Sequence, residues 1–274
     1  MAENQQQSLA PQQNTSAPAH KPETNQIVCS NDATKLTDYI SVRREEFLKK
    51  VPKEASNFDF DLMLSQVAYK LRMDKNLKKS QCTLDSWCTT IMNMCLTGLM
   101  PGYASEKTGE IYLIPYGPMM TASPSYRGMQ ITVMRTGLYR DFDSFTVWEG
   151  DFFERSKSPI EGDSFAYTDK LKHELIQGHM AFCVSLDNRV TDVYYTKRET
   201  EEHESNSRQG DYMKDTWKKW PRQMGEKVVI KVLCKKLSAK SPHKLIDTLL
   251  KVDSDNEKLF IQASTPAALA EGLK

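Results

Sequence analysis

The sequence predicts an α+β protein in which helices pack on a small antiparallel sheet. Three observations point to this class. Apolar residues recur at helical spacing from residue 36 to residue 98, and a two-residue period dominates from about residue 110 to residue 197. The helical period then returns after residue 217. This order of helices, strands and helices is typical of the α+β class.

The chain divides into three parts by composition. Residues 1–34 are rich in Gln, Asn, Ser, Thr, Ala and Pro, and they contain few large apolar side chains. Such a segment cannot bury enough surface to offset its conformational entropy, so we predict that it is disordered. Residues 35–245 form the predicted folded core. Residues 246–274 form a polar C-terminal tail.

Three helices are expected before the sheet. The first covers residues 36–51, and the second covers residues 57–74, with Asn57 or Asp59 as its cap. The third begins after Thr83, a residue that favours the N-cap position, and Gly98 fits its end.

The middle of the chain is expected to form the sheet, with one helix embedded in it. Strands are predicted over residues 110–117, 141–154, 178–188 and 190–197, and Asp187 and Asn188 favour a hairpin turn between the last two. The embedded helix begins at Tyr126. A polar helix or loop follows over residues 198–205, and a long helix is expected between residues 217 and 237.

Composition indicates the cellular location of the protein, but it does not indicate a binding partner. There are 37 basic and 36 acidic residues, so the net charge of +1 indicates no partner by itself. The six cysteines contain no CxxC pair, and neither a secretory signal nor a membrane-spanning run is visible. We therefore expect a soluble, intracellular protein with reduced thiols.

No motif indicates an enzyme, a metal or a cofactor. The sequence lacks HExxH, the phosphate-binding loop GxxxxGK[ST] and the nucleophile elbow GxSxG. Acidic pairs occur at Asp141 and Asp143 and at Glu149 and Asp151, but such pairs are common on solvated surfaces. We predict that the protein has no catalytic residues, no bound metal and no cofactor.

A basic segment stands out against the neutral total. Between residues 214 and 244 the chain carries ten lysines and arginines and only two acidic residues. Trp217 and Trp220 lie within this segment. Cations that bind phosphates, interleaved with aromatic faces that stack on bases, are typical of proteins that bind single-stranded nucleic acid.

Helical geometry places three lysines of this segment along one side of a predicted helix. At about 100° per residue, Lys227, Lys231 and Lys235 lie along one side of the predicted helix. The adjacent side, expected to be buried, carries Ile230, Leu233, Cys234 and Leu237. Neighbouring lysines repel one another, so an anion should bind there. Acidic residues elsewhere in the fold, or solvent alone, remain alternatives to a nucleic acid.

The stretch SYRGMQITVMRTG, residues 125–137, offers a second anion site. Arg127 lies at a helix start, where the helix dipole favours negative charge. A phosphate at that end would suit both the free backbone N–H groups and the arginine, and Gly128 would permit close approach of a backbone. The alternative is a core helix with one surface arginine.

Four motifs in order resemble the RecT family of phage-encoded single-strand DNA annealing proteins, over roughly residues 58–240. LTGLMPG (96–102) followed by YLIPYG (112–117) is similar to the family's L-G-L-x-P-G and Y-L-x-P-F/Y-G stretch. SYRGMQITVMRTG resembles its Y-R-G-M helix, and VWEGDFFE (147–154) resembles its V-x-E-G-D strand. The spacing of Trp217, Met224, Lys227 and Lys231 is similar to its W-x(6)-M-x-x-K-x(3)-K/R helix.

This resemblance implies a function without bond chemistry. Such proteins coat single-stranded DNA as rings or helical filaments and anneal it to a complementary strand without ATP. The implied fold, a small antiparallel sheet with packed helices, is shared with the lambda-type annealing proteins. The implied partners are single-stranded DNA, the nascent duplex, further copies of the chain, a 5′–3′ exonuclease and the host single-strand binding protein.

We therefore expect a DNA-binding groove on this chain. The candidate DNA-binding residues are Tyr126, Arg127, Trp217, Lys218, Lys219, Arg222, Lys227, Lys231 and Lys235. The sequence departs from the family at Pro221, where many members carry an aromatic residue; the helix should start there, with Trp220 taking over the aromatic's role. Two other classes stay open: a metal-dependent nuclease that uses Asp141, Asp143 or Glu149, and a structural protein that oligomerises without DNA.

Overall fold

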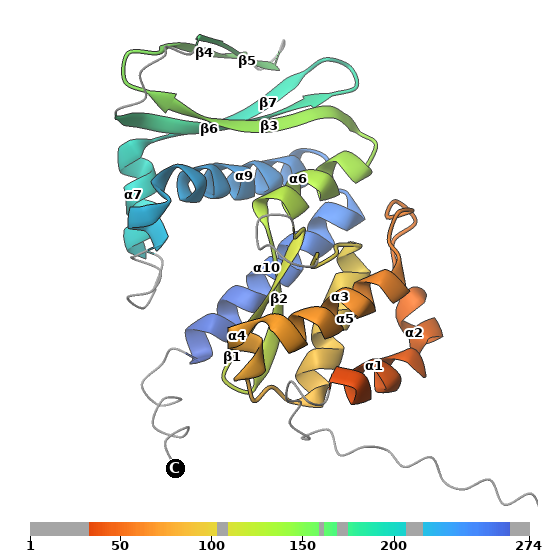
Figure 1. The fold of residues 1–274 in the computed structure, drawn as a ribbon. Helices are drawn as coiled ribbons and strands as arrows, with labels where there is room; N and C mark the ends of the chain where they lie inside the picture. Colours follow the sequence, from red (N-terminus) through yellow and green to blue (C-terminus); the bar gives the residue numbers. More distant parts are fainter. Residues whose placement is uncertain (1–32, 103–108, 159–161, 169–174, 207–215, 264–274) are drawn as a thin grey trace, which may run out of the picture.

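The computed structural model describes residues 33–102, 109–158, 162–168, 175–206 and 216–263 (Figure 1). The predicted disorder of residues 1–34 falls outside these residues, except that Ala33 and Thr34 belong to the first helix. The helices are α1 (Ala33–Ser41), α2 (Arg44–Leu48), α3 (Phe60–Met73), α4 (Lys75–Lys78), α5 (Leu84–Thr97), α6 (Tyr126–Arg135), α7 (Lys197–Asn206), α9 (Pro221–Lys240) and α10 (Lys244–Ala263).

The strands form two antiparallel sheets. They are β1 (Ile111–Tyr116), β2 (Met119–Pro124), β3 (Tyr139–Trp148), β4 (Phe152–Ser158), β5 (Gly162–Thr168), β6 (Ile176–Ser185) and β7 (Val190–Thr196). β1 and β2 pair with each other, and the other five are ordered β3-β6-β7-β5-β4. The predicted α+β class is confirmed.

Local sequence signals explain several element boundaries. The Oδ1 atom of Asp59 accepts a hydrogen bond from the backbone N–H of Leu62 at 2.9 Å and so caps α3. Thr83 caps α5 in the same way, and Gly98 ends that helix in the left-handed conformation, with φ 64°. The hairpin turn between β6 and β7 is also confirmed, and Asn188 adopts φ 66° there. These caps and turns agree with the residues that the sequence analysis selected.

Two predicted elements are divided in the structure. The helix expected over residues 36–51 is broken after Ser41, and α2 begins after Arg43, which leaves the helical conformation with φ −103° and ψ 13°. The strand expected over residues 141–154 is two strands, β3 and β4. Gly150 adopts φ 87° between them, and the Asp151 carboxylate accepts from the backbone N–H of Trp148 at 2.9 Å, which closes the turn.

Strands β3, β6 and β7 of the five-stranded sheet are covered on both faces (Figure 1). α9 packs along one face, against β6, β7 and β3, and α6 lies beside it. The β4–β5 hairpin folds over the other face. Phe145 of β3 stacks on Tyr167 of β5, with ring centroids 4.4 Å apart, and Phe165 of β5 contacts Phe182 of β6. An aromatic layer therefore attaches the hairpin to the sheet.

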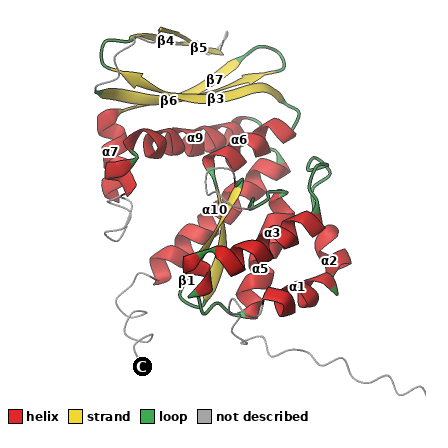
Figure 2. Ribbon diagram, viewed as in Figure 1, coloured by secondary structure: helices red, strands yellow, loops and turns green. Residues whose placement is uncertain are grey.

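Helices α1 to α5 and α10 gather below this sheet, together with β1 and β2 (Figure 2), whereas α7 packs against β6, β7 and α9. A single hydrophobic core runs from α1 through α5 and α6 to α9 and α10. Ile246 and Leu249 of α10 are fully buried in it, and the side-chain amide of Asn256 donates to the carbonyl of Ala122 in β2 at 2.6 Å. The predicted division between core and tail at residue 246 therefore falls inside α10. None of the described helices is both long and apolar enough to cross a membrane.

Candidate nucleic-acid interface

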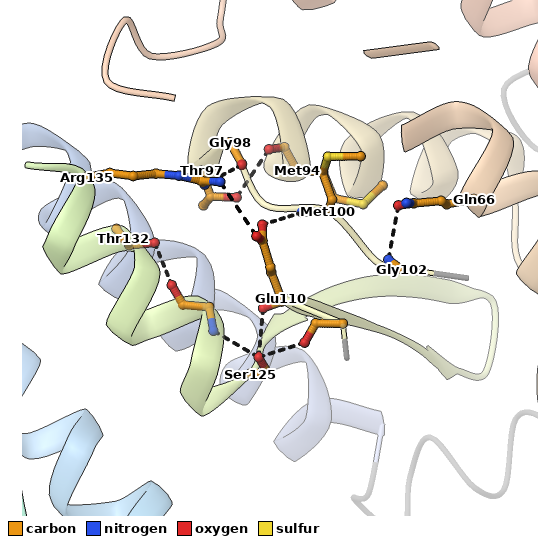
Figure 3. A network of polar contacts seen from close by, with 12 residues as sticks. Gln66, Met94, Thr97, Gly98, Met100, Gly102, Glu110, Ser125, Thr132 and Arg135 are labelled. Atoms are coloured by element: carbon orange, nitrogen blue, oxygen red, sulfur yellow. Dashed lines mark hydrogen bonds and ion pairs between the residues drawn. The ribbon is translucent and has the colours of Figure 1, made fainter. Parts of the chain in front are cut away.

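The start of α6 is fixed by one serine. The backbone N–H of Gly128 donates to the Oγ atom of Ser125 at 3.0 Å, which caps the helix. The same hydroxyl lies 2.9 Å from the carbonyl of Gly109 and 3.0 Å from that of Glu110 (Figure 3). The cap therefore joins the first turn of α6 to the segment that leads into β1.

Gly128 is required by this packing. A Cβ atom at this position would lie 2.0 Å from the carbonyl oxygen of Glu110 and 3.1 Å from a methyl group of Leu99. The close approach that the sequence predicted for this glycine is thus made by the chain's own backbone.

A partly buried ion pair fixes the other end of the same motif. Arg135 donates to the carbonyl of Gly98 at 2.6 Å, and its guanidinium lies 3.6 Å from the Glu110 carboxylate. Glu110 also accepts from the backbone N–H of Met100 at 3.1 Å (Figure 3). The stretch 96–102, the start of β1 and helix α6 therefore form one polar network, which explains why their motifs occur together.

Tyr126 and Arg127 point away from this network. Tyr126 is 41% exposed and Arg127 is also exposed. Within the described part of the chain, Arg127 forms neither an ion pair nor a side-chain hydrogen bond. An unpaired arginine at a helix N-terminus, next to a tyrosine ring, can bind a phosphate and stack on a base.

The start of α9 supplies more cations. Pro221 occupies the first helical position, as predicted, and Lys218, Lys219 and Arg222 are exposed just before and after it. Arg222 is held by Glu226, whose carboxylate accepts from its Nε atom at 2.9 Å.

The two tryptophans of the basic segment differ in exposure. Trp217 is only 7% exposed, so its ring is not open to a base in this structure, whereas Trp220 is 51% exposed. Trp220 was expected to replace the aromatic residue that many family members carry at position 221. It is the more exposed of the two tryptophans.

The lysine stripe of α9 is not an open row of cations. Lys235 is exposed, but the Lys231 side chain is only 18% exposed and lies 2.6 Å from the Asp253 carboxylate of α10. Glu257 of α10 forms a second ion pair with Lys231. Desolvation lowers the pKa of Lys231, but the two carboxylates outweigh it and the net shift is upward.

Lys227 lies one turn earlier in the same partly buried region. Desolvation lowers the pKa of Lys227 more than the negative charges of Asp253 and Glu257 raise it. Lys231 therefore pairs with acidic residues of the fold, Asp253 and Glu257, as one of the alternatives for the lysine stripe proposed. The buried side of α9 is as predicted, because Ile230, Leu233, Cys234 and Leu237 are all buried.

The acidic residues of the nuclease alternative lie on β3 and the turn after it. Asp141, Asp143 and Glu149 are exposed. Within the described ranges, no group of three or more His, Cys, Asp or Glu side chains is arranged to hold a metal ion.

The carboxylates that pair with these lysines were not predicted from the sequence. Asp253 and Glu257 are four residues apart on α10, so they lie on one face of the helix, as Lys227 and Lys231 do on α9. This matching spacing was the available signal. It could not be used before α9 and α10 were known to pack together.

Fold and site together define an α+β protein with an exposed arginine and tyrosine at one helix start and a basic helix packed beside it. A model of the RecT family matches residues 62–255, and the chain belongs to the RecT family. It is also similar to the uncharacterized protein YqaK of Bacillus subtilis (strain 168), with 24% identity over 131 residues. That match covers 48% of this chain and 44% of YqaK, so the chain spans less than half the length of this relative.

Proposed function

We propose that this protein binds single-stranded DNA and anneals it to a complementary strand in homologous recombination, without ATP. The observation that carries the proposal is the RecT match over residues 62–255. The exposed Arg127, unpaired among the described residues, supports the proposal of a phosphate-binding position at the start of α6.

The chemistry of annealing explains the kind of site. Phosphates must be held while bases remain free to pair, so contacts should be few and directed at the backbone. The proposed DNA surface begins at Tyr126 and Arg127 on α6. It continues with Lys218 and Lys219, which precede α9, and with Arg222 and Lys235 on α9. Lys227 and Lys231 contribute behind them, from a partly buried position. Trp220, being exposed, is the better candidate than Trp217 for stacking on a base.

The finer features follow the family resemblance. We propose that the protein assembles as rings or helical filaments on DNA, catalyses no bond chemistry and acts in the bacterial cytoplasm. We also propose that a 5′–3′ exonuclease and the host single-strand binding protein contact it through the C-terminal region. Since α10 is part of the core up to Val252, those contacts would use its exposed side or the residues that follow it.

The direct test replaces Arg127 with alanine. We expect Arg127→Ala to weaken binding of a fluorescently labelled oligonucleotide such as oligo-dT by about tenfold or more. The substitution removes a charge-assisted hydrogen bond to a phosphate. Thermal stability should hardly change, because the side chain is exposed. Fluorescence anisotropy and a thermal melt provide the two readouts.

Arg198→Ala is the matched control, because Arg198 is an exposed arginine on α7 among the acidic residues Glu199, Glu201 and Glu202. Its loss should leave DNA binding unchanged. Loss of stability with binding retained in Arg127→Ala would mean that Arg127 is structural. Magnesium-dependent strand degradation by the pure protein would instead favour the nuclease alternative.

A further inference from the structure

The two carboxylates on Lys231 differ in their surroundings. The Asp253 side chain is 9% exposed and lies 2.6 Å from the lysine, whereas the Glu257 side chain is 59% exposed. One carboxylate is therefore enclosed by the protein, and the other reaches the lysine from the solvent side.

The backbone that carries Asp253 is firmly anchored. Val252 is buried in the core on one side of it, and Asn256, one turn later, is bonded to the carbonyl of Ala122 at 2.6 Å. Asp253 cannot leave Lys231 without moving this turn of α10. Glu257 can leave by rotation of its own side chain, because its carboxylate stands in solvent.

The charges of this cluster balance before DNA arrives. Lys227 and Lys231 contribute two positive charges on α9, and Asp253 and Glu257 contribute two negative charges on α10. A phosphate that approaches Lys231 from solvent must take the position of the exposed carboxylate. It would then leave Asp253 as the remaining counter-ion of the two lysines.

We infer that Glu257 occupies a phosphate position on Lys231 and is displaced when single-stranded DNA binds, while Asp253 remains as a permanent counter-ion. This inference rests on the proposed DNA-binding function. The energetics favour such an exchange. Solvent-exposed ion pairs are weak, so Glu257 is easily displaced, whereas removal of a buried partner leaves an uncompensated charge and is strongly unfavourable. Glu257 thus lowers the affinity of the protein for single-stranded DNA, because the phosphate must displace it from Lys231.

The test compares two substitutions that change the charge of α10 equally. Glu257→Gln removes the displaceable carboxylate from Lys231. Asp255→Asn removes a carboxylate two residues away that pairs with Lys258 at 3.1 Å and has no contact with Lys231. Oligo-dT binding of the full chain is measured by fluorescence anisotropy across a salt series.

We expect Glu257→Gln to bind oligo-dT about two- to five-fold more tightly than the wild type at low salt, the range that one exposed ion pair supplies. Its salt dependence should also steepen, by at most about 0.7 in the slope of log affinity against log salt, since one more lysine charge is available to DNA. Asp255→Asn should change both quantities much less. In a Lys231→Gln background, Glu257→Gln should give no gain.

Equal gains from Glu257→Gln and Asp255→Asn, in a protein that binds DNA, would overturn the displacement and leave the proposed function standing. A gain that persists without Lys231 would overturn it as well. Failure of the wild type itself to bind oligo-dT at low salt would instead remove the proposed function on which the inference rests.

Asp253→Asn tests the other half of the inference by a separate readout. We expect this variant to have a lower melting temperature than the wild type, because Lys231 loses its buried partner. Glu257→Gln should melt close to the wild type. The reverse order of the two melting temperatures would contradict the assignment of Asp253 as the permanent counter-ion.

Discussion

At the scale of single residues, the motif Tyr126-Arg127-Gly128 combines two roles: its glycine packs against the chain, and its first two side chains are exposed. Tyr126 and Arg127 face solvent, whereas the Cα atom of Gly128 faces the carbonyl of Glu110. The motif therefore conveys both packing and binding within three residues. A close approach was predictable from the glycine, but the identity of the approaching backbone depends on where residues 109–110 lie in the fold.

We expect Gly128→Ala to lower the free energy of unfolding by about 2 kcal/mol, since the added Cβ would overlap a backbone oxygen that cannot rotate away. Chemical denaturation measures this change. Gln130→Ala on the same helix is the control and should stay within about 0.5 kcal/mol of the wild type. A Gly128→Ala protein as stable as this control would show that the Glu110 segment is free to shift.

The sequence pattern could not predict which of the two tryptophans is buried. Trp217 and Trp220 lie three residues apart in the same basic segment, yet one is buried and the other is half exposed. Their spacing places both on the same general side of a helix, and only the break before Pro221 separates their environments.

At the scale of elements, α9 is the part of the structure that connects sheet and site. Its Gly225 packs directly on the ring of His179 in β6, where an added Cβ would lie 2.1 Å from the Nε2 atom. The Nδ1 atom of His179 lies 3.0 Å from the hydroxyl of Thr146, which donates to Glu226 at 3.0 Å. Sheet, helix and Arg222 are therefore linked through one buried histidine.

This histidine should make stability depend on pH. Desolvation lowers the pKa of His179 to about 4, with a smaller contribution from Arg222. In the unfolded chain the pKa is near 6.5, so between these values the unfolded state binds the proton more readily. Neutral His179 therefore contributes its full stabilisation above about pH 6.5. As the pH falls from 6.5 towards 4, the free energy of unfolding should decrease by about 3 kcal/mol.

Denaturation of the wild type and His179→Gln across this pH range measures the effect. The variant should show a flatter dependence of unfolding free energy on pH, whatever its stability at pH 7. His203→Gln is the control, because His203 stacks on Tyr195 at the exposed surface of α7. Parallel pH profiles for the wild type and His179→Gln would mean that the ring is protonated without unfolding.

The β4–β5 hairpin is attached to the rest of the sheet by few backbone bonds. Its register with β7 consists of the single pair Asp163 and Val190. Charged contacts compensate for this: Arg155 pairs with the fully buried Asp192, and Lys236 of α9 donates to Asp163 at 2.8 Å. We expect this ionic network, together with the aromatic layer, to hold the hairpin in place.

Asp192→Asn should therefore lower the free energy of unfolding by about 3 kcal/mol, because Arg155 loses its buried counter-charge. Thermal or chemical denaturation provides the measurement. Asp187→Asn, in an exposed turn with Arg189, should leave stability nearly unchanged. Equal stabilities of the two variants would show that the aromatic layer alone holds the hairpin.

Sequence patterns predicted some elements well and others not at all. The buried side and the start of α9 were predictable, because periodicity and a proline report them directly. β2 and β5 were not predicted: MMTASP and GDSFAYT are short, and neither shows a clear two-residue alternation of apolar and polar residues. Likewise, the polar partners of Lys231 and Lys236 come from α10 and β5, and only tertiary packing sets such pairs.

At the scale of the whole molecule, the α+β order and the family followed from the sequence, but the accessibility of the site did not. Leu99, Met129 and Val133, from two of the four motifs, lie in one hydrophobic core, and α10 closes over part of the lysine stripe of α9, which was expected to bind an anion. Of the candidate DNA-binding cations, Arg127 is exposed at the start of α6, and Lys218, Lys219, Arg222 and Lys235 are exposed just before α9 or along it. The molecule therefore presents a limited cationic surface in spite of a near-neutral total charge.

The most direct test of this account is the annealing of two complementary fluorescent oligonucleotides by the purified full chain, without ATP, across a salt series. We expect the wild type to accelerate annealing and the acceleration to fade as salt rises. Arg127→Ala should abolish most of the acceleration, and Arg198→Ala should not. No acceleration by a folded wild-type protein, with no DNA binding at low salt, would contradict the proposed function.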